Sequence, residues 1–197
     1  MNKLVFATNN QNKVEEIRSI ISGQFDVVSL KEAGIDIDIP EPHNTLEENA
    51  SEKSQTIYRL TGENCFSEDT GLETEALHGE PGVKSARYAG EGKSANDNIK
   101  KLLQALHGFE NRKARFRTVI SAIINGEERL FSGTCEGYIG FEPKGLKGFG
   151  YDSIFIPVGD TRTFAEMSLE EKNRFSHRKK ALAQFLEFLS QDGNRMY

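Results

Sequence analysis

The residues best suited to chemistry lie in one short acidic segment, residues 66–72 (FSEDTGL). Residues 63–66, up to the start of this segment, are predicted to form a buried strand. A strand ending there would expose the two adjacent acids in a turn at the edge of a sheet. Because consecutive residues of an extended chain point to opposite faces, Glu68 and Asp69 should serve different purposes. One could hold a hard cation or a water molecule while the other orients the loop, and a plain solvated turn is the alternative.

A second polar segment, residues 9–13 (NNQNK), lies where a strand is expected to meet a helix. It follows a predicted strand over residues 3–8 and precedes apolar residues at helical spacing, which end at Gly23. Ligands of α/β proteins commonly bind at such a junction, because helix N-termini present N–H groups to anions, and Lys13 would add a full positive charge. Asparagines also cap helices that bind nothing, so both readings stay open here. A Walker P-loop is excluded, since no G-x-x-x-x-G-K-[ST] sequence occurs.

Two further charged residues, Glu41 and Lys53, have sequence neighbours that limit the directions they can take. Glu41 lies between Pro40 and Pro42, whose rings stiffen the backbone that carries its carboxylate. Lys53 lies on the apolar stripe of a predicted helix over residues 45–62. A lysine in that place either snorkels from the edge of the core or points into a cleft, and snorkelling is the commoner case.

Residues 137–152 are dense in glycine, with aromatic and lysine side chains between the glycines. Glycine lets the backbone approach a ligand closely, and an aromatic ring beside it could stack on a base; a flexible loop between strands is the alternative. Residues 176–178 (SHR) begin the last predicted helix, where the cationic side chains of His177 and Arg178 oppose the helix dipole. Positive charge in that position indicates an anionic or electron-rich partner.

Apolar periodicity predicts the elements that must position these side chains. The Asn125-Gly126 pair between two β-rich runs is a strong hairpin signal. Capping boxes that begin at Thr45 and Ser168 mark two helix starts. The predicted strands cover residues 3–8, 25–30, 35–39 (a half-buried edge strand), 63–66, 116–124, 129–136 and 153–157, and the predicted helices cover residues 14–21, 45–62, 94–108 and 176–189.

The composition is that of a soluble globular chain of 197 residues, 37% of them hydrophobic and 28% charged, and we expect one domain over residues 1–197. No apolar run could span a membrane, and the N-terminal apolar run is too short for a signal peptide, so we expect a cytoplasmic protein. Cys65 and Cys135 lack metal-site spacing and are predicted to be buried thiols. The net charge of −5 argues against a protein that grips nucleic acid, but permits a small anionic ligand.

Five motifs, taken in order and spacing, resemble those of the inosine triphosphate pyrophosphatase family, which hydrolyses non-standard purine nucleoside triphosphates such as ITP, dITP and XTP. The resemblance extends over nearly the whole chain and rests on residues 8–13 (TNNQNK), 67–71 (SEDTG), 148–152 (GFGYD), 171–172 (EK) and 176–178 (SHR). It implies an α/β fold with a long mixed central sheet flanked by helices, whose two lobes surround a central substrate cleft. It also implies a homodimer and Mg²⁺-dependent cleavage that yields a nucleoside monophosphate and pyrophosphate.

The resemblance also assigns roles to individual residues. The residues expected to hold the phosphates and sugar are Thr8, Asn9, Asn10, Gln11, Asn12, Lys13 and Lys172, with Lys53 as a helper. Glu41 and Asp69 are expected to bind Mg²⁺, and Asp69 to accept a proton from water. Thr70 is expected to touch the substrate and Phe149 to stack on the base. The remaining substrate contacts are expected from Gly150, Tyr151, Asp152, His177 and Arg178, and the last three of these are expected to read the edge of the base.

Base selectivity then has a physical rationale in Arg178, whose guanidinium can only donate hydrogen bonds. It can satisfy the 6-oxo group of hypoxanthine or xanthine but opposes the 6-amino group of adenine. A buried donor left unpaired costs about 1–3 kcal/mol, or roughly tenfold to a hundredfold per contact. Exclusion of guanine must be steric. The chain departs from the family at Asn9, where many relatives have glycine, at Tyr151, where others have tryptophan, and at Glu68, where some have aspartate.

Two other classes of function compete with this one. A non-catalytic nucleotide-binding regulator would keep the binding residues without the reaction, although a sensor has no need of a metal with a base beside it. A broad-specificity nucleotide phosphatase would release orthophosphate instead of pyrophosphate. A single-strand nucleic-acid binder is disfavoured by the net charge and by the lack of a basic stripe.

Overall fold

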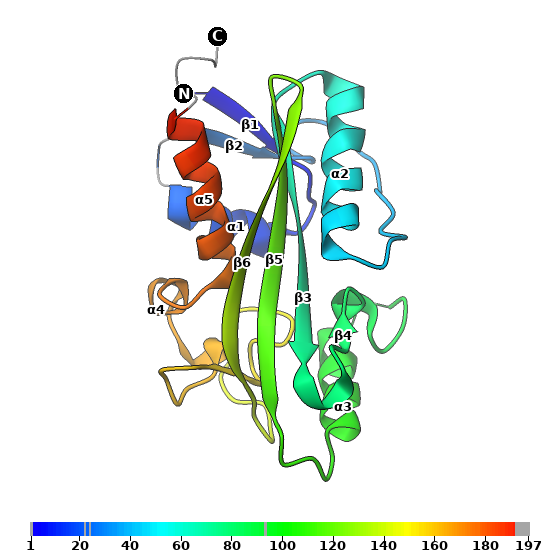
Figure 1. Cartoon of the computed structure of the whole chain (residues 1–197), viewed down its shortest axis with the longest axis vertical. Helices are drawn as coiled ribbons and strands as arrows, with labels where there is room; N and C mark the ends of the chain where they lie inside the picture. Colours follow the sequence, from blue (N-terminus) through cyan, green and yellow to red (C-terminus); the bar gives the residue numbers. More distant parts are fainter. Residues whose placement is uncertain (1, 22, 24, 93, 192–197) are drawn as a thin grey trace. The chain divides into compact units, whose positions relative to one another are not determined.

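The computed structural model describes residues 2–21, 23, 25–92 and 94–191, and Figure 1 labels its elements. The strands are β1 (Asn2–Phe6), β2 (Phe25–Ser29), β3 (Cys65–Thr74), β4 (Pro81–Gly82), β5 (Lys113–Ile124), β6 (Glu127–Ile139) and β7 (Phe155–Pro157). The helices are α1 (Gln11–Ile21), α2 (Leu46–Thr61), α3 (Ala95–Ala105), α4 (Leu169–Asn173) and α5 (His177–Gln191). Single 3₁₀ turns occur at Glu75–Leu77, Ser85–Arg87 and Phe164–Glu166.

The strands form one mixed sheet in the order β2-β1-β3-β5-β6-β7, with β4 paired to β3. β1 runs parallel to both of its neighbours, so that Phe6 lies opposite Ser29 of β2 and Phe66 of β3. The pairs β3–β4 and β6–β7 are antiparallel. The predicted α/β class, with helices flanking a mixed central sheet, is confirmed.

The chain divides into two compact units. Unit 1 comprises Met1–Asp69, Thr118–Gly133 and Arg178–Tyr197, and unit 2 comprises Thr70–Arg117 and Thr134–His177. The strands β3, β5 and β6 contribute residues to both units. Each unit has its own hydrophobic cluster.

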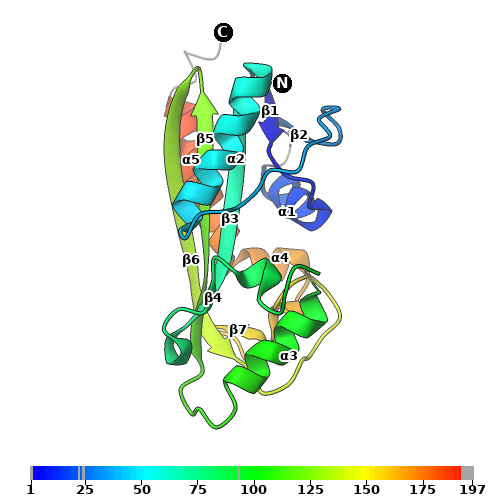
Figure 2. The ribbon, with the colours of Figure 1, turned by 90° about the vertical axis from the view of Figure 1, so that its right-hand side faces the viewer.

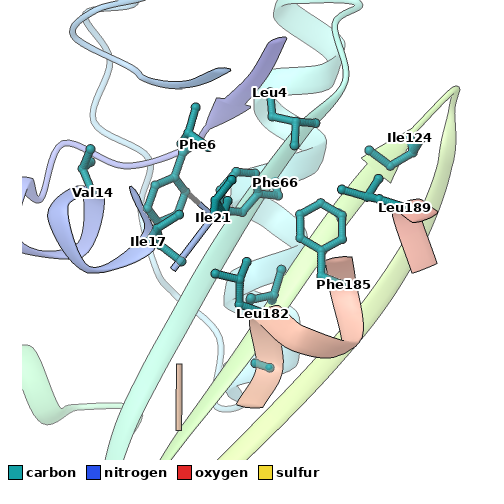
Figure 3. Packing of buried hydrophobic residues seen from close by; sticks show 14 residues of the cluster. Leu4, Phe6, Val14, Ile17, Ile21, Phe66, Ile124, Leu182, Phe185 and Leu189 are labelled. Atoms are coloured by element: carbon teal, nitrogen blue, oxygen red, sulfur yellow. The ribbon is translucent and has the colours of Figure 1, made fainter. Parts of the chain in front are cut away.

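The core of unit 1 is built on the two faces of its strands. Leu4 and Phe6 of β1 pack with α1 and α5 on one face, whereas Val5 packs with Ile57 of α2 on the other. Figure 2 shows α2 in front of β3 and β5, with α5 behind them. Figure 3 shows the larger cluster, in which the rings of Phe6 and Phe66 stack with their centroids 4.5 Å apart. Alternation of apolar side chains along β1 therefore fixes two helical layers at once.

The core of unit 2 gathers α3 and a group of aromatic rings. Leu102 of α3 is fully buried within this cluster. The ring of Phe116 lies 4.6 Å from that of Phe155 and 6.2 Å from that of Phe164 between centroids. These rings pack with aliphatic side chains of β3, α3 and β6 in the same cluster.

Local signals correctly placed both ends of α2 and the turn of the β5–β6 hairpin. Thr45 accepts a hydrogen bond from the backbone N–H of Glu48 at the start of α2, and Gly62 ends that helix with φ of 66°. The two-residue turn of the β5–β6 hairpin has positive φ at both Asn125 and Gly126, as a type I′ turn requires. None of the helices in the described ranges is long and apolar enough to cross a membrane.

Two predictions about strands were wrong. Residues 35–39 alternate as expected between half-buried and exposed positions, but they pair with no strand in the described part of the chain and pack onto the unit 1 core as an irregular segment. The acidic segment is not a turn, because β3 continues through it to Thr74. Cationic neighbours, described below, make it possible to bury Glu68 and Asp69 within a strand. The predicted burial of both cysteines is confirmed, and both are free thiols.

Candidate active site

The polar segment that follows β1 forms the N-terminal cap of α1. Thr8 Oγ1 accepts a hydrogen bond from the backbone N–H of Asn10 at 3.1 Å, and Asn10 Oδ1 accepts one from the N–H of Lys13 at 3.4 Å. Residues 9–12 are exposed. Asn9 has no positive φ, so this position does not demand glycine. The segment leaves exposed amide side chains beside the positive end of a helix, which suits an anionic ligand.

Glu68 lies at the centre of a buried ionic network in unit 1. Arg178 binds both carboxylate oxygens, through Nε at 2.7 Å and Nη2 at 2.8 Å, and Lys13 Nζ lies 3.1 Å from Oε1. Arg178 Nη1 also binds Glu16 of α1. Burial alone would raise the pKa of Glu68, but Arg178 and Lys13 outweigh it and hold the pKa well below the usual range. Glu68 is therefore ionised and oriented by its partners.

Asp69 faces a different set of partners, all in unit 1. Lys53 Nζ lies 3.2 Å from Asp69 Oδ1 and 2.6 Å from Glu41 Oε1, so two carboxylates share one buried ammonium. Burial raises the pKa of Asp69 above its usual value, although Lys53 opposes this effect. The predicted division between adjacent acids is thus observed: Glu68 contacts α1 and α5, and Asp69 contacts α2. Opposite pKa shifts in neighbouring carboxyl groups are typical of an acid–base site, with the raised one free to take a proton.

The position of Lys53 is set by hydrogen bonds between α2 and the sheet. Ser67 Oγ donates to the carbonyl of Ala50 at 2.5 Å, and the hydroxyls of Ser54 and Ser121 lie 2.6 Å apart. All three serines are fully buried or nearly so. These contacts lie one turn before and one residue after Lys53, so its side chain leaves the helix at a fixed point beside β3. The lysine is 6% exposed, so it points inward instead of snorkelling.

Unit 2 contains a second set of predicted residues. Lys172 Nζ lies 2.5 Å from Asp152 Oδ2, which also accepts the backbone N–H of Phe149 at 2.9 Å. The same ammonium lies 5.2 Å from the centroid of the half-buried Phe149 ring. Asp152 and Lys172, which the family resemblance assigned to different ends of the substrate, are therefore direct partners. Their pairing orients the backbone that carries Phe149.

The other predicted residues of unit 2 are held by core contacts. The ring of His177 stacks on Phe116, with centroids 4.8 Å apart and planes 16° from parallel. Tyr151 is 4% exposed, and its hydroxyl donates to the carbonyl of Ser85 at 2.8 Å. A ligand could therefore contact the backbone at Tyr151 but not its ring face. Thr70 and Gly150 are half-buried.

Comparison with known proteins places this geometry in a family. The family model described as Ham1 family matches residues 4–188. This chain belongs to the Ham1 family. It is 50% identical to a Porphyromonas gingivalis protein named dITP/XTP pyrophosphatase, over 96% of this chain and 98% of that one. It is 47% identical to a Flavobacterium johnsoniae protein of the same name, over 95% and 98%. The solved structure of the Staphylococcus aureus Ham1 protein matches with a TM-score of 0.87 at 39% identity, over 97% and 100% of the two chains.

Two buried residues of this Ham1 chain were not predicted from the sequence. Glu16 binds Arg178 and lies at the edge of the apolar stripe of α1, four residues before Ile20, but glutamate is seldom buried, so the residue type gave no sign of its role. Asn49 contacts Asp69 and lies one turn before Lys53 on α2. Asparagine inside a predicted helix, on the side that carries a suspected ligand lysine, was the one available sign of its role.

Glycine at position 148 of the Ham1 chain is needed to seat Asp152. A Cβ on Gly148 would lie 2.9 Å from Asp152 Cγ, whereas a Cβ on Gly150 would meet nothing within 4 Å. Both glycines have positive φ, so both alanine variants pay about 1 kcal/mol for the backbone conformation. We expect Gly148→Ala to lower the free energy of unfolding in urea by at least about 1 kcal/mol more than Gly150→Ala, because packing clashes typically cost that much. Equal losses would show that Asp152 moves aside freely.

Proposed function

We propose that this chain catalyses the Mg²⁺-dependent hydrolysis of ITP, dITP and XTP to the nucleoside monophosphate and pyrophosphate. The observation that carries the proposal is the convergence of Glu41 and Asp69 on one buried cation beside β3. The names of the Porphyromonas and Flavobacterium relatives, which match over almost their whole length, support the substrate class and the reaction.

The carboxylates present fit a magnesium ion. Mg²⁺ is normally held by one or two carboxylates together with waters and substrate phosphates, so a larger acidic cluster is not required. Within the described ranges no three His, Cys, Asp or Glu side chains form such a cluster. Oxygen atoms of Glu41 and Asp69 already approach a common positive charge, that of Lys53. When bound, the metal would polarise the phosphoryl group and lower the pKa of a bound water.

Asp69 is the proton acceptor in this proposal. Hydrolysis forms a bond from the water oxygen to phosphorus and breaks the anhydride bond between the α and β phosphates, and the water gives up a proton. A carboxylate whose pKa is raised by burial is a better base for that proton than an ordinary surface aspartate. The Lys53 ammonium beside it stays charged, since its two carboxylate neighbours raise its pKa against the effect of burial.

The remaining roles divide between phosphate and base. The exposed cap of α1 and Lys13 would hold phosphate oxygens through N–H groups and positive charge. Phe149 would stack on the base, since its ring is half-buried and its backbone is held by Asp152. Arg178 is 1% exposed and donates to Glu68 and Glu16, so it would oppose the 6-amino group of adenine only with donors beyond those in these contacts. Its guanidinium orientation is fixed by Glu16 and Glu68.

The proposal is tested by steady-state hydrolysis of ITP, dITP, XTP, ATP and GTP, each with Mg²⁺ and with a chelator. We expect kcat/KM for the 6-oxo substrates ITP, dITP and XTP to exceed that for ATP by roughly tenfold to a hundredfold or more, because one or more buried donors would be left unpaired by ATP. Chelation should abolish turnover. Equal rates for all five nucleotides, or turnover that survives the chelator, would contradict the proposal.

The same proposal includes a homodimer and a cytoplasmic location, where the nucleoside triphosphate pool lies. Size-exclusion chromatography with light scattering should give about twice the chain mass of 22.1 kDa. A mass equal to one chain would remove the dimer from the account without affecting the reaction.

A further inference from the structure

Asn49 is a polar residue that is only 1% exposed, although it lies inside a helix. Its side-chain amide makes three contacts, and none of them is with its own helix. Oδ1 accepts the backbone N–H of His43 at 3.0 Å, and Nδ2 donates to the His43 carbonyl at 3.3 Å and to Asp69 Oδ2 at 3.4 Å. A buried amide with this set of partners is a junction between the segment before α2 and strand β3.

The chemistry of the partners fixes which way the amide faces. The N–H of His43 can only donate, so it requires the Asn49 oxygen, and the amide nitrogen must then face the Asp69 carboxylate. The two N–H protons of Asn49 have one acceptor each, His43 O and Asp69 Oδ2. The contact with Asp69 therefore presents an N–H donor to a carboxylate oxygen, at a distance of 3.4 Å that is at the long end of hydrogen bonding.

Asn49 and Lys53 act on opposite oxygens of the same carboxylate. They are four residues apart on α2 and so lie on one face of the helix. Lys53 contacts Oδ1 of Asp69 and Asn49 contacts Oδ2, which together leave the carboxyl group little freedom to rotate. Asn49 accepts a hydrogen bond from the backbone of His43, and Glu41 lies two residues earlier in the same segment. One side chain thus links the backbone near Glu41 to the carboxylate of Asp69.

We propose that Asn49 is a positioning residue for the two metal-binding carboxylates, fixing the rotation of Asp69 and the distance of the Glu41 segment from it. This inference rests on the proposed function, since it assigns Asn49 a part in the same reaction. Mutation of residues that hold metal ligands in place commonly lowers metal affinity or activity about 10-fold to 100-fold, because these residues orient the ligands that touch the ion. A displacement of about 1 Å can cost a similar factor in rate.

The test compares Asn49→Ala and Asn49→Leu with wild type and with a matched control, His43→Ala. Leucine keeps the branched outline of asparagine at a larger volume and loses its hydrogen bonds, whereas alanine leaves a cavity, so an effect that the two variants share comes from the lost amide. The His43 control keeps the backbone groups that Asn49 binds and removes only a half-buried side chain. The readouts are kcat and KM for ITP, the dissociation constant of Mn²⁺ from nucleotide-free protein by the EPR signal of the free ion, and the unfolding midpoint in urea.

We expect both Asn49 variants to lower kcat about 10-fold to 100-fold and to weaken Mn²⁺ binding about tenfold, as for other residues that orient metal ligands. KM for ITP should change less than about threefold, because Asn49 touches no residue of the phosphate-binding cap. His43→Ala should match wild type in all three. A loss of stability alone, with kcat and Mn²⁺ binding as in wild type, would overturn the inference, as would full activity in Asn49→Leu.

The metal measurement separates this inference from the proposed function. If wild type releases no pyrophosphate from ITP but binds Mn²⁺ tenfold more tightly than the Asn49 variants, the proposed reaction fails and the positioning of the carboxylates stands. If wild type hydrolyses ITP and all proteins bind Mn²⁺ equally, the positioning fails and the reaction stands. Absence of both ITP hydrolysis and Mn²⁺ binding in wild type would overturn both.

Discussion

Asp69→Asn is expected to lower kcat for ITP by about a hundredfold to ten-thousandfold, the usual contribution of a positioned general base. The amide has nearly the shape of the carboxylate, so the contacts with Lys53 and Asn49 constrain a side chain of unchanged size. It can no longer accept a proton, and it weakens one of the two carboxylates that fit the metal. The free energy of unfolding should fall by about 1–3 kcal/mol, because Asp69 accepts from both Lys53 and Asn49, and the amide nitrogen of asparagine would face one of these two buried donors.

Glu63→Gln is the matched control for this variant. It also replaces a carboxylate with an amide, but at an exposed position. Glu63 lies two residues before β3 and forms an exposed ion pair with Lys3. Turnover in the control should equal that of wild type. An Asp69→Asn enzyme that keeps more than about a tenth of wild-type kcat would remove Asp69 from the role of base, because general-base losses are larger than that.

Arg178→Ala is expected to lower the free energy of unfolding by about 3–5 kcal/mol, as happens when one partner of a buried ion pair is removed. Arg178 is 1% exposed and binds both Glu68 and Glu16, which are also buried. Removing it leaves two carboxylates in the interior of unit 1, with Lys13 as the cation beside Glu68. Urea denaturation of wild type and variant measures the difference.

Arg162→Ala is the matched control for Arg178→Ala. Arg162 also binds two carboxylates, those of Asp160 and Glu171, but its side chain is 43% exposed. Ion pairs open to water contribute about 0–1 kcal/mol, so this variant should be nearly as stable as wild type. If Arg178→Ala and Arg162→Ala lowered the free energy of unfolding by similar amounts, burial of the Arg178 ion pairs would not add to their effect on stability.

The network of Arg178, Glu68 and Glu16 should also make the folded state less stable as the pH falls. The pKa of folded Glu68 lies below its usual value of 4.5, so the stabilisation is complete above pH 4.5 and declines as the pH falls through the acid range. In Arg178→Ala this contribution is largely absent, and the acid limb of the stability curve should be shallower. Asp69→Asn thus tests the carboxyl group whose pKa is raised, and Arg178→Ala tests its neighbour Glu68, whose pKa is lowered.

Features that depend on a few adjacent residues were predictable from the sequence. The cap at Thr45, the stop at Gly62 and the hairpin turn at Asn125-Gly126 are set by local backbone preferences, and each was correct. The length of β3 was not predictable in this way. Whether a strand ends at an acidic pair or continues through it depends on distant cations, which sequence periodicity does not contain.

The residues of the candidate site were proposed from a family resemblance, and the family match confirms that resemblance. The pairing of these residues within the site was not predictable from the sequence. Glu16 and Arg178 are 162 positions apart, and no local pattern indicates that these two side chains pair. The predicted sign that Arg178 needs an anionic partner was sound, and the chain itself supplies that partner. Only the fold could show that Asn49 reaches Asp69.

The central claim is tested most directly by identifying the products of ITP by ³¹P NMR, with purified wild-type protein and Mg²⁺. The account predicts IMP and pyrophosphate in equal amounts, with no orthophosphate while substrate remains. IDP and orthophosphate would contradict it and indicate a phosphatase. Unchanged ITP in the presence of measurable nucleotide binding would also contradict it, and would indicate a nucleotide-binding regulator with the residues of an enzyme.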